Sequence, residues 1–311
     1  MSSKVVLRVA LIAGGTSSER EVSLKGARTV ESALIELGHR VEFFDPAVDL
    51  LRLAQRASDF DVAFLVLHGK GGEDGTIQGF LELLGIPYQG AGVLGSALAM
   101  HKGLSKKLYS LAGLPVPKGE TFKKSFSSSQ EMLDYAKGIG FPIVVKPATH
   151  GSSIGMSIVE DEKGLLQAID LAFSYDEEVL IEEYIKGREI TGGILEDKPL
   201  PLVEIVVKES TYFDYETKYT PGKADELCPA PLDEKLTKKG KSYALTAHKA
   251  LHLRHYSRTD MILKENEFYV LETNTIPGMT ETSLLPLAAK VAGYSFKDLV
   301  QKLLELALNK P

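Results

Sequence analysis

Three oxygen-bearing side chains near the C-terminal end of the sequence have the types and spacing of ligands for a hard metal ion. Asp260 comes first, and Glu272 and Asn274 follow two residues apart, so that both can point to one side of a strand. Oxygen ligands without Cys or His suit magnesium, which binds one or two carboxylates while nucleotide phosphates complete its coordination. The pattern predicts a site for nucleotide-bound magnesium.

Arg258 and the loop after Asn274 would bring hydrogen-bond donors to this site. Arg258 precedes Asp260 by two residues, so its guanidinium would lie on the same face of the strand. The segment 274–280 contains a proline and Gly278, which is typical of loops whose backbone N–H groups approach an anion. The alternative is a surface hairpin with solvated acidic residues, because acidic side chains are ordinarily exposed.

Two neighbouring strands would hold these residues together. Apolar runs at 261–263 and 268–271 flank the polar segment 264–267, which predicts a β-hairpin. Helical periodicity predicts a long helix before the hairpin and two helices after it, at 232–253, 283–292 and 295–308. The hairpin would gather the three oxygen ligands at one place.

Strands and helices alternate in the first part of the chain. Apolar runs and helical periodicity predict elements at 5–13, 17–37, 41–44, 50–57 and 61–67. Such alternation is typical of the α/β class with a doubly wound parallel sheet, where ligands bind beyond the carboxyl ends of the strands. Two loops, 14–23 and 68–75, are therefore candidates for substrate binding.

Glu19 and His68 are the residues in these loops that could contact a substrate. A helix N-cap explains Ser17 or Ser18 and the nearby acidic Glu21, but it does not require Glu19. Glu19 could hold an ammonium group near the end of the first strand. Two interpretations of His68 stay open, since it either orients Glu19 by a hydrogen bond or is a satisfied histidine at a strand end.

The middle of the chain has the composition of a phosphate-binding site. After a predicted helix at 96–112, a strand at 141–147 contains Lys146, and a loop rich in Gly and Ser leads to a strand at 156–159. The backbone N–H groups of such a loop can bind phosphates, and Lys146 would reach them from the strand. A lysine that is simply exposed is the alternative.

The segment 179–185 predicts a strand, and Glu189 opens the next one after a turn at Gly187. The main chain of such a linker can bind an adenine edge, and Glu189 can bind the ribose hydroxyls. A plain crossover between domains is the alternative.

Residues 210–231 contain several Tyr and Phe and are expected to form a long loop that acts as a lid.

Composition excludes several classes of protein. The 311 residues carry a net charge of −6 with interspersed charges, so no nucleic-acid partner is expected. The single cysteine, Cys228, fits a reducing cytoplasm. Apolar residues never run for 18 positions, so no membrane span is expected, and Arg8 favours a first strand over a signal peptide.

Three patterns that imitate other sites fail in their context. Residues 90–95 match G-x-G-x-x-G, but the preceding strand is short and contains a proline. Residues 240–242 resemble the end of a phosphate loop, yet the segment is predicted to be helical. His248, His252 and His255 share a helical face and are expected to be packed or solvated, because no thiolate or carboxylate is aligned with them.

Taken in order, the motifs resemble those of D-alanine–D-alanine ligases of the ATP-grasp superfamily. The resemblance extends over nearly the whole chain and rests on 14–23, 68–75, 145–147, 151–155, 215–219, 258–260, 272–275 and 277–280. It implies an N-terminal doubly wound parallel sheet domain followed by a two-domain, α+β ATP-grasp fold that binds ATP between its halves. The expected domains are 1–97, 98–184 and 185–311.

The resemblance also implies roles for individual residues. The implied ATP-binding residues are Lys102, Lys146, Ser152, Glu182, Glu183, Ile185 and Glu189. The implied ligands of two Mg²⁺ ions, or of Mn²⁺ in their place, are Asp260, Glu272 and Asn274. The implied substrate-binding residues are Glu19, His68, Lys218, Ser283 and Leu284, and the implied catalytic residues are Glu19, Ser152, Tyr219, Arg258 and Gly278.

The implied reaction joins two D-alanine molecules through a D-alanyl phosphate, for peptidoglycan synthesis, in a cytoplasmic homodimer. Two alternatives stay open, a ligase that uses D-lactate as second substrate and a non-catalytic nucleotide-binding scaffold. Two residues depart from the pattern of the family. His101 stands where Asp is frequent, and His255 stands where Gly is common.

Overall fold

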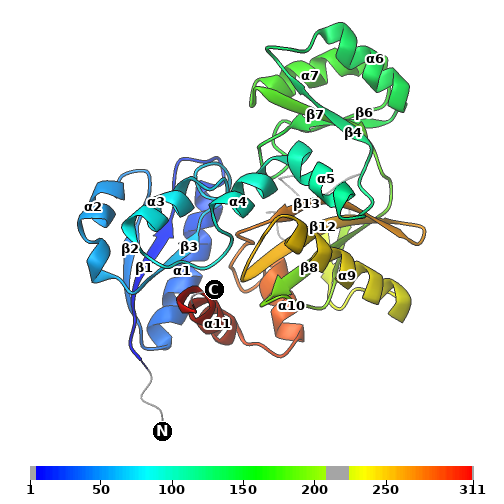
Figure 1. The fold of residues 1–311 in the computed structure, drawn as a ribbon. Coiled ribbons are helices and arrows are strands. Elements are labelled where there is room, and N and C mark those ends of the chain that lie inside the picture. Colours follow the sequence, from blue (N-terminus) through cyan, green and yellow to red (C-terminus); the bar gives the residue numbers. More distant parts are fainter. Residues whose placement is uncertain (1–4, 208–223, 310–311) are drawn as a thin grey trace.

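The N-terminal part of the chain is a parallel sheet with helices around it (Figure 1). The computed structural model describes residues 5–207 and 224–309. The strand order is β2-β1-β3, and both pairings are parallel. The elements are β1 (Arg8–Ala13), α1 (Arg20–Glu36), β2 (Arg40–Phe44), α2 (Leu50–Gln55), a 3₁₀ turn (Ala57–Asp59), β3 (Val62–Val66) and α3 (Thr76–Leu84). The predicted alternation in a parallel sheet is confirmed.

Helices cover both faces of this sheet, which explains why β1 is apolar at almost every position. Val9 and Leu11 belong to an apolar cluster that includes residues of α1. Ile12, which points to the opposite face, belongs to a cluster that includes Leu53 of α2 and Leu81 of α3. A strand that is buried on both faces cannot alternate apolar and polar residues.

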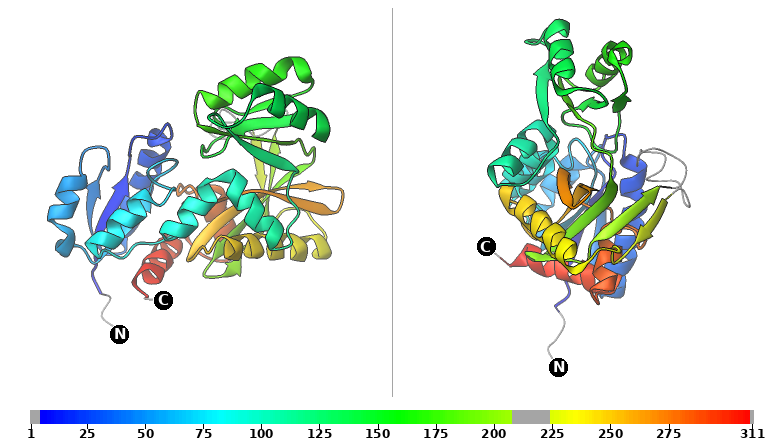
Figure 2. Two further views of the ribbon diagram at one scale, coloured as in Figure 1. Left: turned by 45° about the horizontal axis from the view of Figure 1, so that its top comes forward. Right: turned by 90° about the vertical axis from the view of Figure 1, so that its right-hand side faces the viewer.

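The middle part of the chain is a four-stranded antiparallel sheet that projects from the rest of the molecule in both views of Figure 2. The strand order is β4-β7-β5-β6. Helices α6 and α7 pack on the sheet with an apolar cluster of their own. The elements are β4 (Gly119–Lys123), α6 (Ser129–Ile139), β5 (Ile143–Pro147), β6 (Ser157–Val159), a 3₁₀ turn (Glu162–Gly164), α7 (Leu165–Phe173) and β7 (Glu178–Glu183).

A second antiparallel sheet holds the predicted hairpin. Its order is β11-β10-β8-β12-β13, with β9 beside β8, and α9 packs on it. The elements are β8 (Arg188–Leu195), β9 (Lys198–Pro199), β10 (Val203–Val207), β11 (Ala224–Leu227), α9 (Glu234–Ala250), β12 (Tyr256–Lys264) and β13 (Glu267–Asn274). The predicted loop at 210–231 is wrong at 224–227, because these residues pair with β10 as an edge strand. Residues 210–223 of that loop lie outside the described residues.

The single helix predicted at 96–112 is wrong, because the structure has two helices there, α4 (Val93–Met100) and α5 (Lys102–Leu111). His101 separates them with an extended backbone, and its Nδ1 accepts a hydrogen bond from the N–H of Leu104 at 3.3 Å. The ring also lies 3.0 Å from Glu178 through Nε2. His101 therefore caps α5. The Asp that is frequent at this position in the family could fill the same role.

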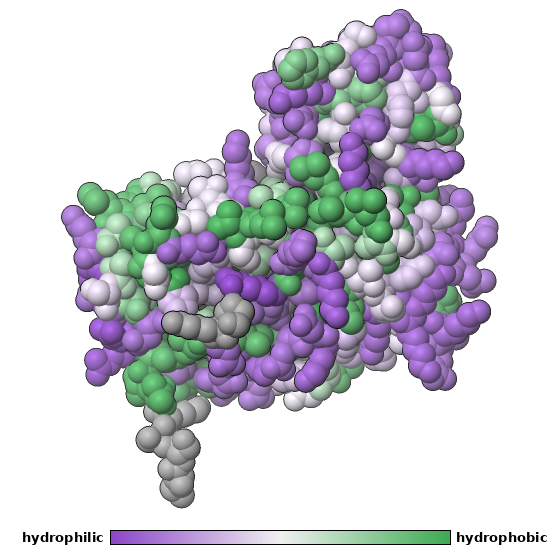
Figure 3. Space-filling view, viewed as in Figure 1, coloured by the Kyte–Doolittle hydropathy of each residue, from purple (hydrophilic) through white to green (hydrophobic). Residues whose placement is uncertain are grey.

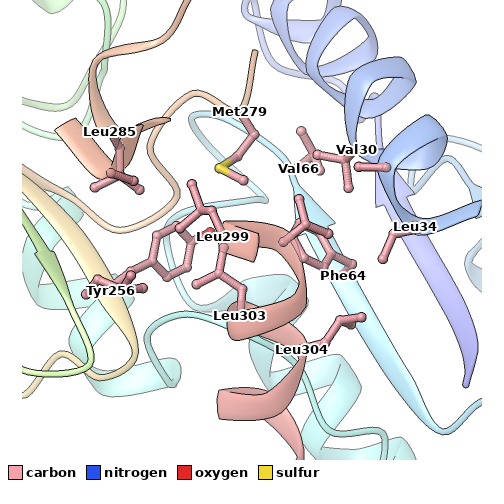
Figure 4. Close-up of a cluster of buried hydrophobic side chains, with 14 of the residues drawn as sticks. Val30, Leu34, Phe64, Val66, Tyr256, Met279, Leu285, Leu299, Leu303 and Leu304 are labelled. Carbon is pink, nitrogen blue, oxygen red and sulfur yellow. The ribbon is translucent and has the colours of Figure 1, made fainter. Parts of the chain in front are cut away.

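The last two helices, α10 (Leu284–Val291) and α11 (Phe296–Leu308), bring the end of the chain back to its beginning. Helix α11 packs on α1 and β3. Figure 4 shows Leu299 and Leu303 of α11 between Phe64 of the first sheet and Tyr256 of the C-terminal sheet. One apolar cluster thus connects the two sheets. No helix in the described part of the chain is long and apolar enough to cross a membrane.

Replacing Leu303 with Ala tests this connection. Leu303 is fully buried in the shared cluster, so the cavity left by Leu303→Ala should lower the free energy of unfolding by about 2–5 kcal/mol. Leu166→Ala is the control, because Leu166 is half-exposed and its truncation leaves no cavity. Urea unfolding measures both variants, and an equal, small effect of the two substitutions would contradict the shared core.

Candidate active site

A cavity lies between the middle sheet and the C-terminal sheet. Its walls come from β5 and β7 on one side and from β8, β12 and β13 on the other. Apolar side chains such as Val144, Ile158 and Met261 offer a surface for a flat ring. The residues with predicted roles that line it are Lys102, Lys146, Glu182, Glu183, Ile185, Glu189, Arg258, Asp260 and Glu272. The fold therefore brings most of the predicted nucleotide and metal residues to one place.

Asp260 is the centre of a hydrogen-bonded cluster at one side of the cavity. It pairs in register with Glu272 across the β12–β13 hairpin. Arg258 donates to both carboxylate oxygens of Asp260, from Nε at 2.9 Å and from Nη2 at 2.8 Å. Asn274 donates from Nδ2 at 3.1 Å, and the hydroxyl of Thr191 on β8 donates at 2.8 Å. The three predicted metal ligands and Arg258 are thus neighbours.

Two buried lysines neutralise the remaining carboxylates. The Nζ of Lys102 lies 3.1 Å from Glu272 and donates to the backbone oxygen of His150 at 2.6 Å. The Nζ of Lys146 lies 2.7 Å from Glu182. Burial alone would lower the pKa of Lys146, but the carboxylates of Glu182 and Glu272 outweigh burial and raise it. Lys146 therefore carries a full positive charge at the cavity wall.

The loop between β5 and β6 is anchored at its base by Asp176. The backbone N–H and the hydroxyl of Thr149 both donate to Asp176 at 2.7 Å. Burial would raise the pKa of Asp176, but the nearby ring of His150 and the hydrogen bonds from Thr149 outweigh burial and hold the pKa well below its usual value. Ser152 and Ser153 have left-handed backbones, with φ of 52° and 58°. Such strained conformations are typical of functional loops.

Glu19 lies just before α1 and meets two other loops. The hydroxyl of Ser152 donates a hydrogen bond to its carboxylate, and the side chain is buried. A Cβ atom at Gly69 or at Gly151 would lie 3.0 Å from Oε2 of Glu19. A side chain at either position would crowd Glu19, and glycine lets the loops approach this closely. The structure brings Glu19 and Ser152 together from positions 133 residues apart.

His68 is buried near Glu19. Burial lowers the pKa of His68, and the carboxylate of Glu19 partly raises it again. The two residues therefore interact electrostatically, while the predicted hydrogen bond between them stays a prediction.

Glu73 is a residue of the site that the sequence analysis missed. Its Oε2 accepts a hydrogen bond from the N–H of Gly69 at 3.0 Å, and its Oε1 accepts one from the N–H of Ile276 at 3.1 Å. Burial, reinforced by the charge of Glu19, raises the pKa of Glu73 to about 7. Glu73 therefore ties the loop after β3 to the loop after β13. In the sequence, the only indication of this role is an acidic residue within a glycine-rich loop.

Lys106 was missed as well. Its Nζ lies 2.8 Å from Glu182, and its side chain is buried. The available signal was its position four residues after Lys102, which places the two lysines on one side of a helix.

The residues predicted for the second substrate lie at the start of α10. Ser283 is the N-cap residue of this helix and Leu284 its first residue. The hydroxyl of Ser283 accepts a hydrogen bond from the N–H of Thr280 at 3.1 Å, and a Cβ at Gly278 would lie 3.0 Å from that hydroxyl. Gly278 and Ser283 are therefore in contact. The predicted residues Lys218 and Tyr219 lie outside the described residues.

The three imitating patterns have structural roles in the fold. Residues 90–95 lead into α4, and residues 240–242 lie inside α9. His248 is buried with Nδ1 2.7 Å from the hydroxyl of Ser257, and Nδ1 of His255 accepts a hydrogen bond from the N–H of Gly90 at 3.1 Å. His252 is exposed, so the expectation that these histidines are packed or solvated is confirmed, but the shared helical face is wrong because α9 ends at Ala250. His255 thus joins the start of β12 to the N-terminal part of the chain.

Comparison with known proteins identifies the family. Models described as D-ala D-ala ligase N-terminus and C-terminus match residues 46–91 and 108–305. A D-alanine–D-alanine ligase from Syntrophobacter fumaroxidans is 53% identical over 97% of this chain and 98% of its own length. The chain belongs to the D-alanine–D-alanine ligase family. A family member from Desulfotalea psychrophila is 51% identical over 98% of this chain and 96% of its own length.

Solved structures of the family agree with the fold. A D-alanine–D-alanine ligase from Bacillus anthracis complexed with ATP is 36% identical, with a TM-score of 0.86, covering 97% of this chain and 98% of that one. The VanG D-Ala:D-Ser ligase from Enterococcus faecalis is 34% identical, with a TM-score of 0.84, covering 97% and 100%. The predicted doubly wound N-terminal sheet and ATP-grasp fold are therefore confirmed.

Glu73→Gln should change how stability depends on pH. The pKa of Glu73 rises from 4.5 to about 7 on folding, so the folded state holds the proton more tightly than the unfolded state. Wild type should therefore lose stability between about pH 4.5 and 7, by at most about 3 kcal/mol from this group. Glu73→Gln should lack that loss. Urea unfolding at several pH values measures it, and parallel profiles of the two proteins would contradict the raised pKa.

Proposed function

We propose that this chain joins two D-alanine molecules to D-alanyl-D-alanine and releases ADP and phosphate from ATP. The observation that carries the proposal is the cavity that gathers Lys102, Lys146, Arg258, Asp260 and Glu272. The names of the relatives and the ATP complex of the Bacillus anthracis ligase support it. The product would serve peptidoglycan synthesis.

Asp260, Glu272 and Asn274 fit a divalent cation. Among the described residues, no three His, Cys, Asp or Glu side chains form a metal-binding group, but this cluster adds an amide oxygen to two carboxylates. Arg258 and Lys102 lie 2.8 and 3.1 Å from these carboxylates, which supports a site for positive charge. We assign two Mg²⁺ ions, or Mn²⁺, to it. Bound there, they would neutralise phosphate charge and orient the ATP.

The first chemical step would activate the carboxylate of one D-alanine. A carboxylate is a poor acyl donor, so its oxygen attacks the γ-phosphorus of ATP, giving D-alanyl phosphate and ADP. Phosphoryl transfer depends mainly on positioning and on neutralising charge. Lys102 and Lys146 would hold phosphate oxygens, and Glu19, fixed by Ser152, would hold the ammonium of the substrate. The residues proposed for adenosine are Glu182, Glu183, Ile185 and Glu189.

The second step would form the peptide bond. The amine of the second D-alanine attacks the acyl phosphate, and the tetrahedral intermediate then expels phosphate. Arg258 and the N–H of Gly278 would stabilise the oxyanion. Ser283 and Leu284, at the positive end of α10, would receive the carboxylate of the second D-alanine. Lys218 and Tyr219, outside the described residues, complete the proposed set, with Lys218 assigned to the phosphates and Tyr219 to Glu19.

D-Serine and D-lactate are alternatives to D-alanine as the second substrate. The VanG neighbour is named for D-serine, and a ligase for D-lactate is the rival already considered. The names of the relatives favour D-alanine over both. A product assay with each acceptor separates them, and a preference for D-lactate or D-serine over D-alanine would overturn the assignment.

A non-catalytic scaffold is the rival of another class. Our proposal expects phosphate release from ATP that depends strictly on D-alanine and on Mg²⁺. A coupled assay for ADP with the purified chain measures it. Folded protein that binds ATP but releases no phosphate with D-alanine would favour the scaffold.

We also propose a cytoplasmic homodimer whose subunits have domains bounded near residues 97 and 184. Figure 3 shows an apolar band across one face, over α4 and α5. The exposed leucines of these helices are Leu94, Leu104 and Leu111. Contiguous exposed apolar surface commonly marks an interface between proteins. Light scattering should give twice the chain mass of 33.9 kDa, and a monomer at micromolar concentration would contradict the dimer.

Arg258→Ala tests the second step. The guanidinium would be one of two oxyanion donors, and loss of one such donor costs about 3 kcal/mol of barrier, so turnover should fall by roughly 100-fold or more. Arg56→Ala is the control, because Arg56 forms a partly exposed ion pair with Glu42 on the N-terminal unit. Steady-state ligation measures both. An Arg258→Ala protein of normal turnover would refute the role.

A further inference from the structure

Glu182 is held between two lysines that reach it from different elements. Lys146 lies on β5, the strand next to β7, with its Nζ 2.7 Å from Oε1 of Glu182. Lys106 lies on α5, with its Nζ 2.8 Å from Oε2. The side chain of Glu182 is only 2% exposed, and those of the lysines are at most 10% exposed. The three residues therefore form a buried chain of alternating charge.

The two lysines face different spaces. Lys146 and Glu182 line the cavity between the sheets, and Lys106 does not. Lys106 instead lines a groove between α5 and β4. Close packing holds it there, because a Cβ at Gly103 would lie 2.0 Å from the hydroxyl of Thr121 on β4. Lys106 is therefore fixed behind the wall that carries Glu182.

Two lysines for one carboxylate leave a surplus positive charge, which suits a site for phosphates. If Lys146 turns toward a phosphate oxygen, Glu182 loses one of its partners. A buried carboxylate without a counter-ion is strongly unfavourable, so it would either become protonated or keep Lys146 away from the phosphate. Lys106 removes this conflict because it can stay on Glu182.

We propose that Lys106 is a positioning residue for ATP, a resident counter-ion of Glu182 that frees Lys146 to bind the nucleotide phosphates. The inference rests on the proposed function, since it concerns the ATP site. It assigns a task to a residue that does not line the proposed ATP cavity.

The protonation states agree with this task. Burial lowers the pKa of Lys106 to about 8, with Lys146 lowering it further and Glu182 and Glu272 raising it. Burial would raise the pKa of Glu182, but the two lysines outweigh burial and lower it. At neutral pH both lysines are therefore charged and Glu182 is ionised.

Lys106→Met tests the proposal, because methionine keeps the length of the side chain and removes its charge. The dissociation constant for ATP, measured by calorimetry on the full chain, should rise at least about tenfold, while the KM for D-alanine stays within about twofold. Lys107→Met is the matched control, since Lys107 is the next residue on α5 and its side chain is 63% exposed. Lys106→Arg, which keeps the charge, should restore ATP affinity. Unchanged ATP affinity in folded Lys106→Met would overturn the proposal.

A second pair of variants, made in Glu182→Gln protein, tells whether Lys106 acts as a counter-ion or only packs. In Glu182→Gln protein there is no carboxylate charge to balance, so adding Lys106→Met should change ATP affinity by less than about twofold. An equal loss in both backgrounds would assign Lys106 to packing and overturn the proposal.

Two further results keep the inference and the proposed function distinct. Should Lys106→Met fail to fold, a structure of wild type with a non-hydrolysable ATP analogue decides, with Lys106 on Glu182 and Lys146 on a phosphate as the expected arrangement. Lys106 turned away from Glu182 would overturn the inference alone. Wild type that binds no ATP would overturn the proposed function itself.

Discussion

The structure depends on pairing three carboxylates at the central cavity with basic side chains. Glu182, Asp260 and Glu272 come from three strands, and each has a lysine or arginine within 3.1 Å. Charges removed from water are tolerated only with such partners. Lys146 meets Glu182 within the middle sheet, and Arg258 meets Asp260 within β12. Helix α5 instead serves both sheets, because its Lys102 reaches Glu272 of the C-terminal sheet and its Lys106 reaches Glu182 of the middle sheet. A phosphate that entered this cavity would exchange partners with existing ions rather than bring the first charge into an apolar space.

The second requirement is that three loops from distant parts of the sequence meet around Glu19. The hydroxyl of Ser152 donates a hydrogen bond to Glu19, and Gly69 and Gly151 leave room for its carboxylate because they have no side chain. Glu73 then fastens the loop after β3 to the loop after β13. The proposed amino-acid site and the proposed nucleotide site are thus parts of one connected set of contacts. Displacing any of these loops would move Glu19 relative to the lysines that would hold phosphate.

Local sequence patterns were sufficient to predict most helices and strands, because burial of one or both faces of an element determines where its apolar residues occur. The hairpin that gathers Asp260 and Glu272 could be predicted from two apolar runs and a polar turn. The break between α4 and α5 at His101 could not be predicted, since the apolar periodicity continues across it. The side chain of His101 caps α5 at this point. The edge strand at 224–227 is polar, and its pairing with β10 alone defines it. The roles of Glu73 and Lys106 could not be predicted, because Ile276 and Glu182, which they contact, lie far away in the sequence.

Helix α11 has a consequence for how the chain is made. Leu299, Leu303 and Leu304 cover one face of the first sheet, against residues such as Phe64 and Val66. A ribosome delivers that sheet more than two hundred residues before it delivers these leucines. Helix α1 covers part of this face from the start, but the part that α11 covers has no native partner during translation and stays exposed until the end of the chain is made. Truncation of the last helix would leave the newborn N-terminal part permanently prone to aggregate.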